Sequence, residues 1–149
     1  KTVDSLKLFR PDVVAFKLVQ MKGRITPINW EHIGDFEIDY SAYIKAIKEI
    51  NPNCTFILCS PLDMVIATKG LSPERINDLT LRRPRIWELR KRARKIAKAE
   101  GAYFLDLTKT FEGRSNLMTI SDGVHPNKDG YNYMAKLVFD FMVKKRIVK

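Results

Sequence analysis

The fold class follows from one stretch of sequence, Asn51-Pro52-Asn53-Cys54-Thr55-Phe56-Ile57-Leu58-Cys59-Ser60-Pro61. Its centre, residues 55–59, is a continuous apolar run, which predicts a strand buried on both faces, because a half-exposed strand would alternate apolar and polar side chains. The preceding residues 36–50 repeat apolar side chains at three- and four-residue spacing and predict a helix with one apolar stripe. A helix followed by a doubly buried strand indicates a parallel sheet.

The same alternation of strands and helices continues on both sides of this stretch. Residues 13–19 predict a first strand, in which Lys17 indicates that the far end meets solvent or a cleft. Residues 103–107 predict a third strand. Two further helices are predicted at about residues 84–100 and 126–144.

Turn-forming residues set the predicted ends of these helices. Gly101 is placed to end the second long helix in the left-handed conformation, and Pro126 is suited to the first turn of the last helix. Residues 62–84 contain Gly70, Pro73 and Pro84 and predict a long loop with a short helix. The predicted inward-facing stripes are Ile86, Leu89, Ala93, Ile96 and Ala97 in one helix, and Tyr131, Met134, Leu137, Val138, Phe141 and Met142 in the other.

We therefore predict an α/β fold of flavodoxin-like, doubly wound architecture, with a parallel sheet between helices on both faces. Three strands are fewer than the roughly 5 usual for a sheet. Residues 1–149 are expected to be one domain, the C-terminal part of a larger unit whose N-terminal strands precede Lys1. Lys1 is neither a start methionine nor part of a signal peptide, so we expect a chain that is processed, cut or recorded in part.

Composition is that of a folded protein, with 45% hydrophobic and 30% charged residues. No apolar run reaches the roughly 18–20 residues that cross a bilayer. The net charge of +10 includes a basic run between Arg82 and Lys98, expected on the outer face of its helix as a solvated surface or a polyanion-binding stripe. Cys54 and Cys59 are an odd number of residues apart, which predicts opposite faces and two buried free thiols.

The candidate chemistry lies in Ser121-Asp122-Gly123-Val124-His125-Pro126-Asn127. A histidine accepts a proton from a hydroxyl near neutral pH, and does so well when a carboxylate holds its other ring nitrogen. Asp122 and His125 can meet in this way if the chain turns between them, as Gly123 permits. A metal site is not indicated, because only His32 and His125 are present and no cysteine–histidine cluster has ligand spacing.

The longer segment closely resembles the last motif block of the SGNH (GDSL-type) hydrolases, through Asp122 to Asn127, Gly130-Tyr131 and Met134-Ala135. Pro11-Asp12-Val13-Val14 resembles that family's third strand, and residues 36–61 and 103–107 resemble later elements in the same order. The resemblance implies a Ser-His-Asp triad with His125 as base and Asp122 as its acid, and no metal or organic cofactor. It also implies an ester substrate.

The chain departs from the family at its other motifs. No Gly-Asp-Ser block that would carry the nucleophile is present, and neither is the second block, whose glycine helps to form the oxyanion hole. The third block falls on Val19-Gln20-Met21-Lys22, where Met21 replaces the asparagine that donates to the oxyanion. Gln20 or Asn29 could supply this hydrogen bond in its place only through a shift of the loop. Ser121 is expected to be a turn residue.

These observations lead to three hypotheses. The first is a serine hydrolase of small O-acyl esters, on carbohydrates, lipids or simple esters, whose serine precedes Lys1 or lies on a separate chain. The second is an SGNH-like domain that has lost catalysis and acts as a binding or scaffold module. The third, a nucleic-acid or polyanion binder using the basic helix, is less favoured because no aromatic residues are interleaved for base stacking. The sequence does not indicate a cellular location.

Overall fold

The computed structural model describes residues 2–17 and 30–148, apart from the side chains of residues 2–4 and 6. The predicted strand end at Leu18-Val19, the block from Val19 to Lys22 and Asn29 lie outside the described residues. The elements are α1 (Thr2–Phe9), β1 (Val13–Lys17), η1 (His32–Asp35), α3 (Phe36–Ile50), β2 (Thr55–Cys59), α4 (Pro73–Glu100), β3 (Tyr103–Leu105), α5 (Leu107–Phe111), η2 (Ser115–Leu117) and α6 (Lys128–Lys144).

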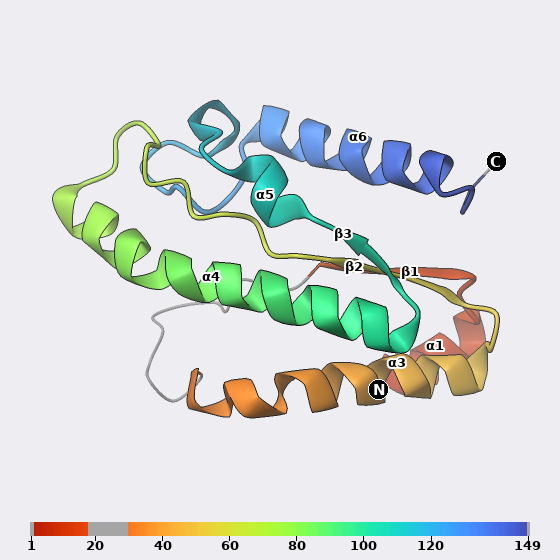
Figure 1. Ribbon diagram of the computed structural model, residues 1–149. Helices are drawn as coiled ribbons and strands as arrows, with labels where there is room; N and C mark the ends of the chain where they lie inside the picture. The colour runs from red at the N-terminus through yellow and green to blue at the C-terminus, as the bar shows by residue number, and fades with distance from the viewer. Residues whose placement is uncertain (1, 18–29, 149) are drawn as a thin grey trace.

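The three strands form a parallel sheet in the order β1-β2-β3. β1 pairs with β2 along its whole length, from Val13 opposite Thr55 to Lys17 opposite Cys59. Helices α3 and α4 cover one face of the sheet, and α6 lies over the other (Figure 1). The predicted α/β fold, with a parallel sheet between helices on both faces, is confirmed.

The central strand β2 explains why its sequence is apolar throughout. Phe56 and Leu58 pack into a cluster with residues of α3 and α4, whereas Ile57 and Cys59 pack into the cluster on the α6 side. Cys54 belongs to the first of these clusters and Cys59 to the second, and both are buried free thiols. The prediction that the two cysteines lie on opposite faces is confirmed.

The helix α4 is longer than predicted, and the expected loop with a short helix over residues 62–84 is wrong in its second half. α4 begins at Pro73 and continues through Pro84 to Glu100, where Gly101 caps it in the left-handed conformation, as predicted. Pro84 lies on the exposed side. In a regular helix, the carbonyl of Thr80 would accept a hydrogen bond from the backbone N–H of residue 84, which proline lacks. Thr80 is exposed as well, so water can reach this carbonyl instead.

The start of α4 has a clear local signal. The Ser72 hydroxyl accepts a hydrogen bond from the backbone N–H of Arg75 at 3.2 Å, and Pro73 occupies the first turn. Leu79 is fully buried in the same cluster as Ile86 and Leu89. Tertiary burial of this extended stripe therefore outweighs the cost of one proline on the opposite side.

Two other predicted boundaries shift because polar side chains cap helices. β3 ends at Leu105, and Asp106 instead caps α5 by accepting the N–H of Lys109 at 3.1 Å. α6 begins at Lys128, and Pro126 is not in its first turn but forms an isolated antiparallel bridge with Met118.

The inward stripe predicted for α6 is largely correct. Its members from Met134 to Met142 are partly buried against the sheet, whereas Tyr131 is half exposed, contrary to the prediction. In the described part of the chain, no helix combines the length and the apolar character needed to cross a membrane.

Candidate active site

Asp122 and His125 lie in the loop between η2 and α6 and contact each other directly. The Nδ1 atom of His125 is 2.8 Å from Oδ2 of Asp122. The other carboxylate oxygen, Oδ1, accepts the backbone N–H groups of Val124 at 2.8 Å and His125 at 3.1 Å. The predicted turn between the two residues is therefore present and brings their side chains together.

The loop is held at its base by backbone hydrogen bonds. The N–H of Thr119 donates to the carbonyl of His125 at 2.9 Å, and the N–H of Asp122 donates to the carbonyl of Thr119 at 3.2 Å. Gly123 has a φ of +70°, and a Cβ atom there would lie 2.8 Å from Cδ1 of Leu79 and 3.0 Å from the carbonyl oxygen of Val65. A glycine is thus required both by the left-handed backbone and by the close packing.

The segment after β2 also contacts this loop. The N–H of Val65 donates to the carbonyl of Gly123 at 2.8 Å, and the N–H of Ser121 donates to the carbonyl of Lys69 at 3.1 Å. Ser121 has a φ of +63°. The loop that bears the pair is therefore joined to the carboxyl end of the central strand, the side on which parallel sheets commonly bind ligands.

Asn127 attaches the loop to α6. Its Oδ1 accepts the N–H of Gly130 at 2.9 Å, while its Nδ2 donates to the carbonyls of Asn116 at 2.8 Å and Met118 at 3.2 Å. One side chain thus caps the helix and fixes the chain on both sides of His125.

The pair is electrostatically suited to proton transfer. Burial alone would raise the pKa of Asp122, but the hydrogen bonds from the His125 side chain and from the backbone of His125 and Val124 lower it overall. The lowered pKa favours the ionised form of Asp122, which can accept a hydrogen bond from Nδ1 of His125 when that nitrogen carries the proton. The side chain of His125 is 68% exposed, and its Nε2 remains the ring atom that can take up a proton.

Arg75 also contacts the loop, a neighbour that sequence reasoning missed. Its Nε donates to the backbone carbonyl of Asp122 at 3.0 Å, and its Nη2 is 3.6 Å from Oδ1 of the same residue. The capping signal at Ser72 predicts a helix start next to Arg75, but no sequence pattern connects residue 75 with residue 122.

The structure gives other roles to several hydroxyl and thiol groups. The hydroxyl of Ser60 is buried, accepts a hydrogen bond from the backbone N–H of Thr108 at 2.9 Å and lies 3.0 Å from the Thr108 hydroxyl. Ser72 caps α4. Burial raises the pKa of Cys59 to about 11, although the charge of Lys17 opposes the shift, so this thiol is not ionised near neutral pH.

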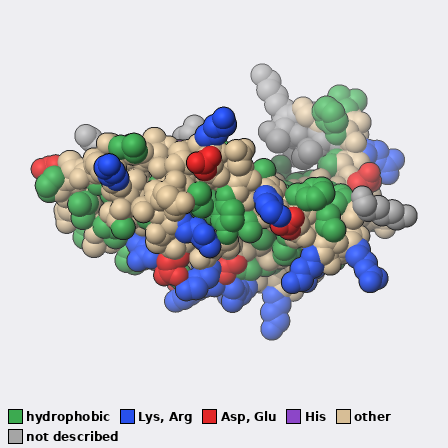
Figure 2. Space-filling view, turned by 90° about the horizontal axis from the view of Figure 1, so that it is seen from above, with side chains coloured by type: hydrophobic (Ala, Val, Ile, Leu, Met, Phe, Trp, Pro, Cys, Tyr) green, Lys and Arg blue, Asp and Glu red, His purple; other side chains and the backbone are tan. Residues whose placement is uncertain are grey.

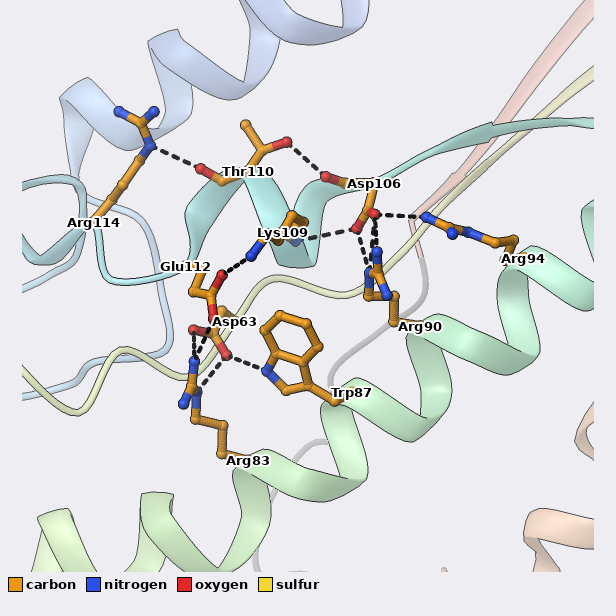
Figure 3. Close-up of polar contacts among 10 residues, drawn as sticks. All are labelled: Asp63, Arg83, Trp87, Arg90, Arg94, Asp106, Lys109, Thr110, Glu112 and Arg114. Atoms are coloured by element: carbon orange, nitrogen blue, oxygen red, sulfur yellow. Dashed lines mark hydrogen bonds and ion pairs between the residues drawn. The ribbon is translucent and has the colours of Figure 1, made fainter.

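The basic run of α4 is mostly paired within the protein, so its predicted placement on a solvated outer face is wrong for most of its arginines. Arg83 pairs with Asp63 and Glu112, and Arg90 and Arg94 both pair with Asp106 (Figure 3). The acidic partners lie far away in the sequence, which is why the run alone did not reveal them. Arg82 and Arg92 are paired as well, with Asp78, Glu37 and Glu88.

A metal site is not formed by the residues that the structure describes, since no group of three or more His, Cys, Asp or Glu side chains is placed to hold an ion.

Comparison with solved structures supports the fold. The structure is similar to a GDSL-like lipase from Parabacteroides merdae ATCC 43184, with 22% identity, a TM-score of 0.63 and coverage of 91% of this chain and 65% of that one. It is also similar to the acetyl xylan esterase AlAXEase, with 21% identity, a TM-score of 0.60 and coverage of 92% and 70%. A peptidoglycan O-acetylesterase structure gives 15% identity, a TM-score of 0.66 and coverage of 95% and 40%.

These likenesses concern the fold, and this chain spans 65% of the length of the P. merdae protein. No curated protein sequence matches the chain. A family model, however, covers residues 11–133, which include β1, the three-stranded sheet and the Asp122–His125 loop. The chain belongs to the GDSL-like lipase/acylhydrolase family.

Proposed function

We propose that this chain supplies the base and the orienting acid of a serine ester hydrolase that acts on small O-acyl esters. His125 is the general base, Asp122 orients it, and the nucleophilic serine belongs to residues before Lys1 or to a separate chain. Residues 1–149 form the C-terminal part of a single domain. The observation that carries the proposal is the 2.8 Å contact between Nδ1 of His125 and Oδ2 of Asp122, on an exposed loop of a family domain.

The chemistry follows from the two ring nitrogens. Nε2 of His125 takes the proton of the serine hydroxyl as its oxygen bonds to the acyl carbon. The imidazolium, stabilised by Asp122, then gives that proton to the departing alcohol oxygen, and the carbon–oxygen bond of the ester breaks. Water attacks the acyl-enzyme in the same way, its proton passing through Nε2 to the serine oxygen as the free acid leaves.

The substrate class is inferred from relatives. One structural neighbour is an acetyl xylan esterase and another is a peptidoglycan O-acetylesterase, so O-acetyl groups on carbohydrates are the first substrates to test. Lipid and simple esters remain within the same proposal.

The described sheet has room for the segment that would carry the serine. β1 is at one edge of the three-stranded sheet, and its Ala15 and Lys17 are exposed. Beside them is a groove of about 670 Å³, lined by apolar side chains of α6 that include Met134 and Val138. Figure 2, which views the molecule from above Figure 1, shows hydrophobic side chains open on this side. A further strand and helix packed here would bury these side chains and pair the open edge of β1.

The two other hypotheses differ in what they require. A catalytically silent binding module would keep the loop for packing and would bind without turnover. A polyanion binder would use cations on α4, where Arg83, Arg90, Arg92 and Arg94 are engaged by carboxylates and the exposed Lys91, Lys95 and Lys98 are left to contact it. Binding of a polyanion should therefore be weak, and it should be unaffected by His125→Ala.

The proposal is tested with a fluorophosphonate probe on the protein purified at its natural length, followed by intact and peptide mass measurement. We expect one adduct, on a serine outside these 149 residues. His125→Ala should abolish labelling, whereas His32→Ala, which removes the other exposed histidine, should leave it unchanged. Absence of an adduct, or labelling that survives His125→Ala, would overturn the hydrolase and favour the silent module.

A further inference from the structure

The start of α4 reaches the candidate active-site loop through one side chain. Arg75 donates from Nε to the carbonyl oxygen of Asp122 at 3.0 Å, and its Nη2 lies 3.6 Å from the Oδ1 atom of Asp122. Its Nη1 donates to Oδ2 of Asp78 at 2.9 Å. The guanidinium thus connects a carboxylate on its own helix with both the backbone and the side chain of Asp122.

The two oxygen atoms of the Asp122 carboxylate have different partners. Oδ2 contacts Nδ1 of His125, whereas Oδ1 accepts two backbone N–H groups and faces Arg75. A tilt or shift of the carboxylate away from this orientation would lengthen the Oδ2 contact with the imidazole and the Oδ1 contacts with the backbone together. The bond from Arg75 to the carbonyl of Asp122 also holds the peptide that enters Gly123, where the backbone turns into the left-handed region.

The rest of α4 is fixed independently of this contact. Asp63 receives two hydrogen bonds from Arg83, at 2.9 and 3.0 Å, and one from Nε1 of Trp87 at 3.1 Å. Arg90 binds Asp106 at the end of β3 (Figure 3). These contacts join the middle of α4 to the segments that follow β2 and β3, so Arg75 extends from a helix whose position is already set.

We propose that Arg75 is a positioning residue for the Asp122–His125 pair. It acts through Asp122, whose peptide and carboxylate it holds so that Oδ2 stays on Nδ1 of His125, and it does not itself contact the imidazole. This role rests on the proposed function, because a fixed imidazole matters for catalysis only if His125 is the base.

The role is tested in the protein at its natural length by two-bond ¹H–¹⁵N correlation of the histidine rings at about pH 8.5, which reports the tautomer. Neutral His125 should carry its proton on Nδ1, with Asp122 as acceptor. In Arg75→Met, the ¹⁵N shifts of His125 should move towards those of His32, whose Nδ1 lies 3.9 Å from the nearest Asp35 oxygen, beyond hydrogen-bond distance. Arg75→Lys should give an intermediate result, because an ammonium lacks the fork that reaches two acceptors.

Arg82→Met is the matched control. Arg82 also binds Oδ2 of Asp78, at 2.9 Å, but its pairing is with Asp78 on its own helix and not with the Asp122 loop. The Arg82→Met variant should leave the His125 ring signals unchanged. Unchanged His125 shifts in Arg75→Met, or an equal shift in Arg82→Met, would overturn the positioning role.

The labelling rate in the natural-length protein gives a second readout. Arg75→Met should slow the fluorophosphonate reaction by up to about 10²-fold, as expected for a displaced catalytic group. If the ring signals respond as expected but His125→Ala still labels, the proposed function fails while the positioning of the imidazole stands. If His125→Ala abolishes labelling but Arg75→Met changes neither readout, only the positioning role fails.

Discussion

Arg83 of α4 and Asp63 of the segment after β2 form a bidentate ion pair, with Nε–Oδ1 at 2.9 Å and Nη2–Oδ2 at 3.0 Å. The Asp63 side chain is only 1% exposed, and it also accepts the indole N–H of Trp87. The guanidinium of Arg83 lies 5.6 Å from the centre of the Trp87 ring. This cluster joins the long helix to the loop that supports the candidate active site.

Removing one partner of this pair should destabilise the protein strongly. Arg83→Met leaves the Asp63 carboxylate buried without its cation, which typically costs about 3–5 kcal/mol. Asp63→Asn combined with Arg83→Met should lose less than the sum of the two single changes, because the second change removes the unpaired charge. Urea unfolding followed by circular dichroism measures these free energies. Additive losses would show that the pair is not coupled.

The two residues of the candidate active site should differ in their effect on stability. Asp122→Ala removes the acceptor of the backbone N–H groups of Val124 and His125, and should cost about 1–3 kcal/mol of unfolding free energy. His125→Ala removes an exposed ring whose one hydrogen bond to the described residues joins Nδ1 to Asp122, and should change stability by less than about 0.5–1 kcal/mol. Thermal unfolding of the two variants measures both losses of stability. A larger loss in His125→Ala than in Asp122→Ala would contradict the loop geometry.

Acid should weaken the protein partly through Asp106. Burial would raise the pKa of Asp106, but its hydrogen bonds from Arg90 and the backbone of Lys109, with the charges of Arg90 and Arg94, lower it overall. A lowered folded-state pKa means that the group contributes stability above its unfolded pKa of about 3.9. That contribution is lost as the pH falls through the lower, folded-state value.

Asp106→Asn should therefore be less stable than the native protein at neutral pH, and the difference should shrink below about pH 4. Unfolding free energies measured between neutral pH and about pH 2 check this. A difference that stays constant over that range would show that Asp106 acts through its shape and caps α5 without a contribution from its charge.

The sequence predicts well those features that depend on local periodicity. The stripe of residues 36–50 and the apolar run of residues 55–59 became α3 and β2 with the predicted bounds. The Asp122–His125 contact could also be predicted, because both residues and the glycine between them lie within one short turn. In each case, the information is contained in a few neighbouring residues.

Features set by distant contacts could not be predicted in this way. Pro84 reads as a break, yet α4 continues because Leu79 and Ile86 are buried on the opposite side. Asp106 reads as part of a strand, but its carboxylate caps α5 and binds Arg90 from another helix. Arg75 lies 47 positions from Asp122, so only the folded structure shows that the two residues are in contact.

Gly130 provides a test of how α6 packs against the loop that carries His125. In an isolated helix, alanine is favoured over glycine by about 1 kcal/mol, so Gly130→Ala would stabilise α6 if only helix propensity mattered. Here a Cβ atom at residue 130 would overlap the carbonyl oxygen of Leu117 and lie 2.8 Å from Cβ of Pro126. The backbone oxygen cannot move without disturbing the hydrogen bond from the Asn127 N–H to Leu117, so we expect a net loss of about 1–3 kcal/mol. Gly34→Ala is the control, since in the described part of the chain no atom beyond its two neighbours lies within 4 Å of the added Cβ, and it should be neutral or slightly stabilising. Thermal and urea unfolding of both variants measure the effect, and stabilisation by Gly130→Ala would mean that α6 does not approach the loop as closely as the structure indicates.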